Sequence, residues 1–482
     1  MWFSALLACI AVTTLITILH KHSRKRVSPP WPPGPAGHPI LGNLLYVIGP
    51  LRNNPHTALA SLAQTYGPIL SLRLSLTRTI VVVSSAAAAH EALVKNDAAL
   101  ASRLVPDTVC TMSYGATSMV FLPSSNPLWK QDRIIMGARF CSGRGLDTIR
   151  PILECHAGHL TEYLRACSGT GRPVIIREAV NRTVLNVISN ILFSEDVVDL
   201  RAPGPQPFRG LIVPVLEEWS KSNVSDAFPF PSPIDHLLGS RRRISIHLAK
   251  LFNFFDQEIV QRRLARTGTG NENTNDVLDI LLARQAMSKL TRQEIITFLT
   301  DMFIAASDTS TVTVQWAMTQ LLRHPEKMDK VRNELATCLA AGSSDFETLR
   351  LHPAVPLIPR EVATDGVSLG GFPIPIGTGV VVNLWTIGRD PTVWPQSDKF
   401  VPERFLAAGR LYTYKPFGAG RRVCPGMDYA LRSVRLLLAS LVHKTEWRLP
   451  DGMAPEDIDL NDRYGTVLNL ATLLRALPVS TV

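Results

Sequence analysis

One cysteine of the chain lies in a glycine-rich loop just before a long apolar segment. The loop, residues 416–426, has the sequence PFGAGRRVCPG, and the segment from 427 to about 448 is expected to be helical. Glycine tolerates positive φ and lets the backbone approach a ligand closely. A thiolate at Cys424 would accept backbone N–H bonds and face the positive end of the helix, and both effects favour the ionised sulfur. Phe417 would keep water from the sulfur, and Arg422 would hold a carboxylate of a cofactor.

Taken alone, such a loop is most simply interpreted as a free buried cysteine after a glycine turn. A dinucleotide-binding loop fits less well, because the G-x-G-x-x-G spacing is absent and no suitable strand precedes Gly418. The loop resembles the haem-ligand loop of the cytochrome P450 superfamily, F-x-x-G-x-R-x-C-x-G. It matches at every fixed position: Phe417, Gly420, Arg422, Cys424 and Gly426. The resemblance implies a haem b cofactor whose iron is bound by Cys424, a ligand that favours O–O cleavage.

A carboxylate and a hydroxyl lie inside a long predicted helix. A capping box at residues 291–294 starts this helix, which is expected to run to residue 323 and to cross the core. Taken alone, Thr309 would bond back to the carbonyl of Ala305. The segment resembles the family's oxygen-activation motif, [AG]-G-x-[DE]-T-[TS], which implies that Asp308 and Thr309 deliver protons. Ala306 replaces the usual glycine, so we expect the helix to open less at this point.

Several basic residues stand where the family holds its cofactor. Trp129 and Arg133 are four residues apart and share one helix face; without a cofactor they would be a packed tryptophan beside a surface arginine. The W-x-x-x-R resemblance implies that they hold the haem propionates, and Arg360 lies where a further propionate contact is frequent. A positive surface suited to an acidic electron donor is expected from Lys130, Arg139 and Arg144.

A possible ion-pair triad lies between the long helix and the cysteine loop. Glu347 and Arg350 are three residues apart, and Arg404 belongs to the segment PERF at residues 402–405. An E-x-x-R match by itself is frequent by chance. Together with the cysteine loop it resembles the structural triad of the family, which implies that these residues hold the haem loop in place and take no part in catalysis.

The stretch after Arg350, residues 351–359 (LHPAVPLIP), is almost entirely apolar. We expect it to line a substrate pocket together with the long helix. The predicted pocket residues are Ala305, Val355, Leu357 and Ile358. An apolar lining argues for a hydrophobic substrate.

The composition limits the class of protein. The chain has 482 residues, 46% of them hydrophobic, which is ample for a large core. Its net charge is +10, but the basic residues are dispersed, which argues against nucleic acid and favours a membrane surface and an acidic protein partner. The seven cysteines are odd in number and unpaired in spacing, which argues against a disulfide framework and favours a reducing compartment.

The N-terminal region predicts a membrane anchor. Residues 1–20 are mostly apolar and long enough to cross a bilayer with modest tilt, and residues 21–42 combine a basic stop with a proline-rich hinge. A cleaved signal peptide is the alternative, but neither a basic start nor a small-residue cleavage site is evident. We therefore expect a single-pass protein of the endoplasmic reticulum membrane whose cytosolic, haem-binding catalytic domain spans residues 43–482.

The chain departs from the family in two segments. Only twelve residues separate Glu334 from Glu347, where related microsomal enzymes have about twenty more, and residues 406–415 are also short. A shortened segment would give the Glu347 triad less support. An impaired P450-like haem protein is therefore kept as the alternative function.

The fold class expected from the resemblance is mainly α with small β-sheets, that of a cytochrome P450. Residues 69–75 and 78–83 are predicted strands, and residues 85–95 a helix. The resemblance, nearest to plant microsomal geraniol-type and diterpenoid hydroxylases, implies a monooxygenase that hydroxylates a small hydrophobic, terpenoid-like substrate with O2. Electrons would come from NADPH through NADPH–cytochrome P450 reductase, because the chain has no nicotinamide or flavin motif. An oxygen-independent rearrangement enzyme is disfavoured by the pair Asp308 and Thr309.

Overall fold

The computed structural model describes residues 30–38, 42–43, 49–74, 78–221, 239–267, 276–336, 343–406, 414–443, 445–450 and 452–480. The predicted anchor, residues 1–20, and the basic stretch up to residue 29 lie outside these residues, whereas residues 30–38 of the predicted hinge are described and contain no helix. Within the described ranges, no helix combines the length and the apolar character that a membrane crossing requires.

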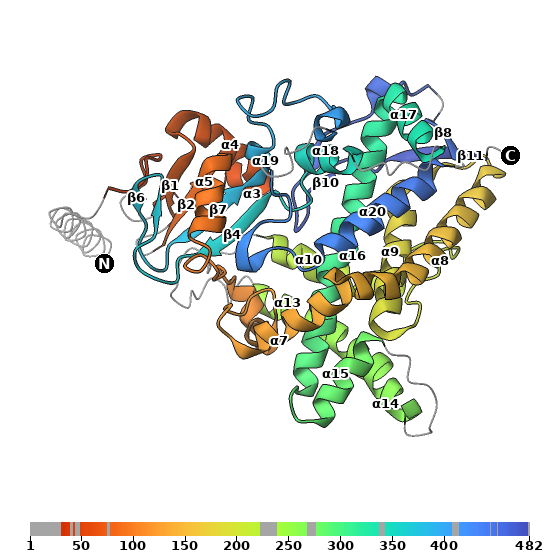
Figure 1. Cartoon of the computed structure of the whole chain (residues 1–482), viewed down its shortest axis with the longest axis horizontal. Helices are drawn as coiled ribbons and strands as arrows, with labels where there is room; N and C mark the ends of the chain where they lie inside the picture. Colours follow the sequence, from red (N-terminus) through yellow and green to blue (C-terminus); the bar gives the residue numbers. More distant parts are fainter. Residues whose placement is uncertain are drawn as a thin grey trace, which may run out of the picture.

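The described chain is mostly helical, with small sheets at two sides (Figure 1). Its first part contains α3 (Pro50–Asn53), α4 (Pro55–Tyr66), β1 (Ile69–Arg73), β2 (Thr79–Val83), α5 (Ala86–His90), η1 (Glu91–Lys95), η2 (Asp107–Ser113), α6 (Tyr114–Thr117), α7 (Pro127–Met136) and η3 (Gly137–Cys141). The middle contains α8 (Gly143–Ser168), β3 (Val174–Ile175), α9 (Ile176–Phe193), α10 (Pro207–Ser220), α13 (Ser240–Asn253), η4 (Phe254–Gln261), α14 (Arg262–Thr267), α15 (Val277–Ala286) and α16 (Arg292–Arg323).

The remaining elements follow α16. They are α17 (Pro325–Ala336), α18 (Ser343–Leu351), β4 (Leu357–Glu361), β5 (Ser368–Leu369), β6 (Phe372–Pro373), β7 (Gly379–Asn383), α19 (Leu384–Ile387), η5 (Pro402–Phe405), η7 (Gly420–Arg422), α20 (Met427–Val442), β8 (Thr445–Arg448), η8 (Pro455–Asp457), β9 (Asp462–Arg463), β10 (Asn469–Leu470) and β11 (Arg475–Ser480).

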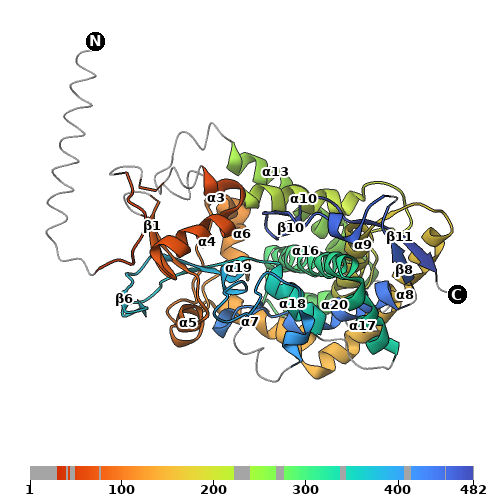
Figure 2. The same ribbon diagram turned by 90° about the horizontal axis from the view of Figure 1, so that it is seen from above.

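Helix α16 is the element around which the others pack. The predicted capping box is confirmed, because the Thr291 hydroxyl accepts from the Glu294 N–H while the Glu294 carboxylate accepts from the Thr291 N–H. The helix ends at Arg323, as predicted, and most of its residues are buried, so it crosses the core. Figure 2 shows α16 in the middle of the molecule, with α9, α10 and α20 around it.

A four-stranded sheet has the order β1-β2-β7-β4, with β2 and β7 parallel and the other pairs antiparallel. Helix α4 contacts it through β1 and β7. Because side chains alternate across a strand, neighbouring residues of β4 face different clusters: Ile358 joins the cluster that contains Val380, and Leu357 packs against the cluster that contains Leu70.

Several predicted boundaries differ from the structure. The first strand ends at Arg73, and the helix expected over residues 85–95 divides into α5 and the π-helix η1. The helix after the cysteine loop ends at Val442, and the prediction that it reaches about residue 448 is wrong. Residues Thr445–Arg448 form β8 instead, because they pair with β11 at the C-terminal end of the chain, a long-range contact that local pattern does not contain.

Candidate active site

The cysteine loop, α16, α7 and β4 enclose a cavity of about 420 Å³. The predicted residues that line it are Trp129, Arg133, Ala305, Asp308, Thr309, Val355, Ile358, Arg360, Phe417, Arg422, Cys424 and Gly426. Leu357 does not line this cavity, and its prediction as a pocket residue is wrong, because the alternation of β4 turns it to the opposite face of the sheet.

The turn of the cysteine loop depends on glycine. Gly420 has φ of 70°, and a Cβ atom there would lie 2.1 Å from Asp97 Oδ1 and 2.5 Å from the carbonyl oxygen of Leu93. The loop closes on itself through the Cys424 N–H, which donates to the Phe417 carbonyl at 3.0 Å. The conformation and the close approach of α5–η1 therefore both exclude a side chain at position 420.

In the polypeptide the sulfur of Cys424 is less readily ionised than the sequence predicts. Burial raises the pKa of the Cys424 thiol, and this effect outweighs the backbone N–H of Gly426 and the charge of Arg133, which lower it. The predicted stabilising groups are present, but desolvation is the larger effect. A positive metal ion beside the sulfur would reverse the balance, because a coordinating thiol is deprotonated.

The cysteine loop is hydrogen-bonded to α7, the helix that carries Trp129 and Arg133. The guanidinium of Arg133 donates to the carbonyl oxygen of Val423 at 2.8 Å, next to the cysteine. Arg133 and Arg422 lie over the Trp129 ring, with guanidinium carbons 5.6 Å and 5.0 Å from its centroid. The pairing at i and i+4 thus places both side chains of α7 at the loop.

Three arginines bring uncompensated positive charge to one edge of the cavity. Arg103, Arg360 and Arg422 all line it, and none takes part in an ion pair within the described chain. Burial lowers the pKa of Arg360 to about 8, with further lowering by Arg103 and Arg422, and burial lowers the pKa of Arg103 to about 10. The Nε atom of Arg103 is buried without a hydrogen-bond partner. Such an edge fits a ligand with two carboxylates, as the propionates of a haem would provide.

Arg103 is a site residue that the sequence reasoning missed. It is the single charged residue in the apolar run from Ala98 to Val105, which is the signal that could have identified it. A lone arginine in such a run requires a partner, and within the described ranges Arg103 donates to the carbonyl oxygen of Pro359 at 3.3 Å but forms no ion pair.

The predicted proton-delivery residues are both bonded to protein groups. Thr309 Oγ1 donates to the carbonyl oxygen of Ala305 at 2.8 Å, which is the local alternative named above. The carboxylate of Asp308 accepts from Arg177 at 3.5 Å and from Asn181 at 3.4 Å, so Oδ1 is directed toward α9. Both residues also line the cavity, one turn beyond Ala305.

The triad of the predicted ion pairs is assembled and buried. The two oxygens of Glu347 accept from Arg350 at 2.7 Å each, and Arg404 Nε lies 3.3 Å from the same carboxylate. Arg350 also donates to the carbonyl oxygens of Gly388 and Ser397, both at 2.6 Å. The shortened segment before Glu347 is formed by the end of α17 and the start of α18, and residues 337–342 and 407–413 lie outside the described ranges. The triad therefore forms despite the shortening.

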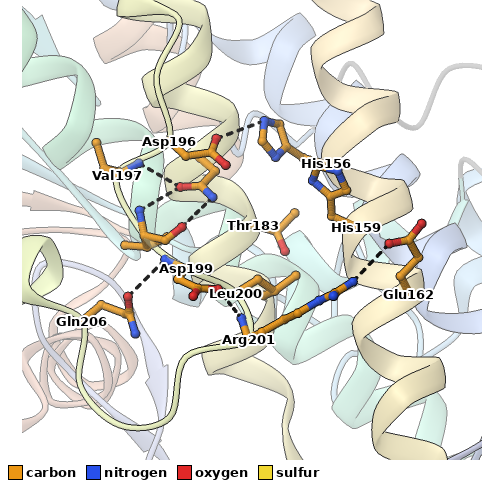
Figure 3. Close-up of a pocket in the computed structure, with 12 residues that line it drawn as sticks. His156, His159, Glu162, Thr183, Asp196, Val197, Asp199, Leu200, Arg201 and Gln206 are labelled. Atoms are coloured by element: carbon orange, nitrogen blue, oxygen red, sulfur yellow. Dashed lines mark hydrogen bonds and ion pairs between the residues drawn. The ribbon is translucent and has the colours of Figure 1, made fainter.

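A second cavity, of about 600 Å³, lies between α8, α9 and the segment that joins α9 to α10 (Figure 3). Its polar groups are largely bonded to one another: His156 lies 3.7 Å from Asp196, Glu162 pairs with Arg201 at 3.3 Å, and the Gln206 amide accepts from the Asp199 N–H. The described residues include no group of three metal-binding side chains. These hydrogen bonds and ion pairs hold the segment that joins α9 to α10, and we assign this second cavity no functional role.

The long helix above a cysteine loop and the arginine-edged cavity define a class of haem-dependent monooxygenase. The chain belongs to the cytochrome P450 family, whose model matches residues 32–472. It is 40% identical to oryzalexin E synthase of Oryza sativa subsp. japonica, over all of this chain and 98% of that protein. It is 37% identical to geraniol 8-hydroxylase of Catharanthus roseus over 93% of each chain, and 35% identical to drimenol monooxygenase of Persicaria hydropiper over 99% and 97%.

Proposed function

We propose that this P450 monooxygenase binds haem b through Cys424 and hydroxylates a small terpenoid. The observation that carries the proposal is one cavity lined by the Cys424 sulfur, by the buried Arg360 and Arg422 and by the partly buried Arg103, with no ion pair of these arginines among the described residues. Two relatives, named geraniol 8-hydroxylase and drimenol monooxygenase, support the substrate class.

The residues around the cavity have distinct proposed roles. Cys424 would bind the iron, with Phe417 and Gly426 beside it, while Arg103, Arg360 and Arg422 would hold the propionates together with Trp129 and Arg133. When bound, the haem supplies the activation of O2 that leads to hydroxylation of a C–H bond. The protein supplies the position of the substrate and the exclusion of water.

Proton delivery is proposed for Asp308 and Thr309. Their side chains are held by Arg177, Asn181 and the carbonyl of Ala305. The hydroxyl of Thr309 would donate its proton into the cavity. Asp308 would then turn away from Arg177 and Asn181 and restore the proton to Thr309. Ala305, Val355 and Ile358 would contact the apolar substrate.

The partners and the location extend the same proposal. Electrons would come from NADPH through NADPH–cytochrome P450 reductase, docking on the basic region near Lys130. Residues 1–20 would anchor the chain in the endoplasmic reticulum membrane. Carbonate extraction of membranes that contain the full-length protein tests this, because an anchored chain stays in the membrane fraction. The domain assignment, a catalytic unit over residues 43–482, belongs to this proposal.

The spectrum of the reduced protein with carbon monoxide tests the central claim. We expect the wild type to show the Soret band of a thiolate-ligated haem and Cys424→Ser to lose it while keeping its helical circular dichroism. Cys155→Ser, an exposed position on α8, is the matched control and should retain the band. A folded wild type that takes up no haem would contradict the proposal and favour the impaired alternative.

The substrate class is tested separately. Turnover with reductase is measured on a panel of geraniol, drimenol, ent-cassadiene and phenolic compounds. Oxidation of terpenoids with an intact carbon monoxide band is the expected result. Oxidation of the phenolic compounds only would overturn the terpenoid assignment and leave the haem assignment in place.

A further inference from the structure

A buried carboxylate on α16 is bonded to a single segment across the cavity. Asp301 is 1% exposed and lines the cavity. Its Oδ1 accepts from the Tyr114 hydroxyl at 2.5 Å and from Ser118 Oγ at 2.8 Å, and its Oδ2 accepts from Ser118 Oγ at 3.0 Å. The backbone N–H groups of Met119 and Val120 also donate to this carboxylate. All of these donors belong to residues 114–120.

The same segment is bonded on its other side to the cysteine loop. Arg422 donates to the carbonyl oxygen of Met119 at 3.2 Å and to that of Leu122. Met119 and Val120 themselves line the cavity. We call residues 118–122 the cavity wall. This wall is held between the anionic Asp301 on α16 and the cationic Arg422 at the arginine edge.

The segment before the wall requires external support. Met112 and Ser113 have φ of 51° and 58°, and neither is glycine. Left-handed backbone at such residues costs on the order of 1–3 kcal/mol each and persists where surrounding contacts impose it. Tyr114, the next residue, stacks on Trp219 with ring centroids 5.1 Å apart and donates to Asp301. The bonds to Asp301 therefore act directly after two residues whose backbone conformation is unfavourable on its own.

We propose that Asp301 is a positioning residue that determines which carbon of the substrate is oxidised. It does so by fixing Met119 and Val120 relative to Arg422, and thus relative to the cofactor edge of the cavity. This inference rests on the proposed function. An amide keeps one acceptor oxygen and replaces the other with an N–H donor, so it has fewer lone pairs for the two hydroxyls and the backbone N–H groups of Met119 and Val120, which can only donate.

The first test needs no substrate. Hydrogen exchange is measured on the peptide covering residues 114–122 in the haem-loaded full-length protein. We expect Asp301→Asn, which keeps the side-chain shape, to exchange about tenfold faster there. Thr297→Val is the matched control, because Thr297 Oγ1 lies 2.9 Å from Thr117 Oγ1 and joins the same two elements without lining the cavity. Equal protection of residues 114–122 in Asp301→Asn and wild type would contradict the proposal that Asp301 fixes the cavity wall.

The second test is the product ratio for the best substrate of the panel. We expect Asp301→Asn to change the ratio of oxidised positions by about fivefold or more, with an unaltered carbon monoxide band. Tyr114→Phe should change it less and in the same direction, and should add little in the Asp301→Asn background because both act through one network.

The outcomes distinguish the proposed role of Asp301 from the proposed function of the protein. Faster exchange with an unchanged product ratio would leave Asp301 a structural role only and would overturn the inference. A wild type that takes up haem but oxidises no panel compound would count against the proposed function. The exchange experiment would still decide whether Asp301 fixes the cavity wall.

Discussion

At the scale of single residues, burial decides the chemistry of the site. Arg360 and Arg103 lose water without forming an ion pair in the part of the chain that the structure describes, and burial is the largest cause of the lowered pKa of each. Cys424 is affected in the same way with the opposite sign, since burial raises the pKa of its thiol. A dicarboxylate ligand with a metal centre would relieve both penalties at once. The desolvated arginines and the desolvated Cys424 thiol thus indicate a ligand that carries both carboxylates and a metal ion.

Arg103→Gln tests this argument at one residue. Loss of one charge-assisted hydrogen bond, ~1.5–3 kcal/mol, should speed haem transfer to apomyoglobin by about tenfold or more. The haem-free variant should unfold at a higher temperature than haem-free wild type, because the variant removes a desolvated cation that forms no ion pair among the described residues.

Arg421→Gln is the control for Arg103→Gln, because Arg421 is a neighbouring arginine of the cysteine loop that does not line the cavity and pairs with Asp97 at 3.3 Å on the surface. It should change neither the rate of haem transfer nor the stability of the haem-free protein. A slower haem loss from Arg103→Gln would contradict the assignment of Arg103 to the cofactor edge.

At the scale of elements, the triad connects α18 to the segment that leads to the cysteine loop. Glu347 is fully buried, and its carboxylate joins Arg350 of α18 to Arg404 of η5. On the surface of the same segment, Glu403 of η5 pairs with Lys327 of α17 at 2.9 Å. The two carboxylates are neighbours in space with very different burial, and they offer a matched comparison.

We expect Glu347→Gln to destabilise the protein by about 3–5 kcal/mol, because two arginines lose the partner of a buried charge. Glu403→Gln should cost less than ~1 kcal/mol, since its ion pairs are partly exposed and screened. The melting temperatures of the two variants are compared, with Arg404→Lys as a milder variant should Glu347→Gln fail to accumulate. Equal melting temperatures would contradict a role of the triad in holding the loop.

At the scale of the whole molecule, α16 carries many of the residues that line the cavity and packs against several other helices. It contacts α9, α18 and α20 and carries Asp301, Ala305, Asp308 and Thr309 along its length. Near its start it also influences Asp132 of α7, which is 3% exposed. Burial raises the pKa of Asp132 to about 8, with Asp301 adding to the effect, and burial raises the pKa of Asp301 to about 6.

These carboxyl groups predict how stability depends on pH. Asp132 binds its proton more tightly in the folded chain than at its ordinary pKa of 3.8, so its favourable contribution is complete below about pH 4 and is lost as the pH rises toward 8. Glu403 has the opposite sign: hydrogen bonds from Lys327 and Lys330 outweigh burial and lower its pKa from 4.5 to about 2, so its contribution is lost as the pH falls through this range.

Burial lowers the pKa of His352 and of His156, so these histidines act in the opposite direction below their ordinary pKa of 6.5. We therefore expect the melting temperature to decline between pH 6.5 and pH 8.5, and Asp132→Asn to reduce that decline by on the order of 3 °C. Asp147→Asn, an exposed aspartate of α8, should leave the profile unchanged. A decline of the same size in Asp132→Asn would show that other groups cause it.

The sequence determined those features that depend on neighbours along the chain. The capping box of α16, its end at Arg323, the glycine turn before Cys424 and the i, i+4 alignment of Trp129 with Arg133 follow from local dihedral and hydrogen-bond preferences. The family motifs added the grouping of these residues around one cavity. Only the tertiary structure decided that Arg103 and Asp301 belong to the site and that Leu357 faces away from it.

Tertiary structure also decided the end of α20, the raised pKa of Cys424 and the direction of Asp308. The physical reason is the same in each case. Desolvation, strand pairing across the chain and the choice of a hydrogen-bond partner depend on groups that are remote in sequence. No local pattern of residues contains that information, whereas a packed core imposes it.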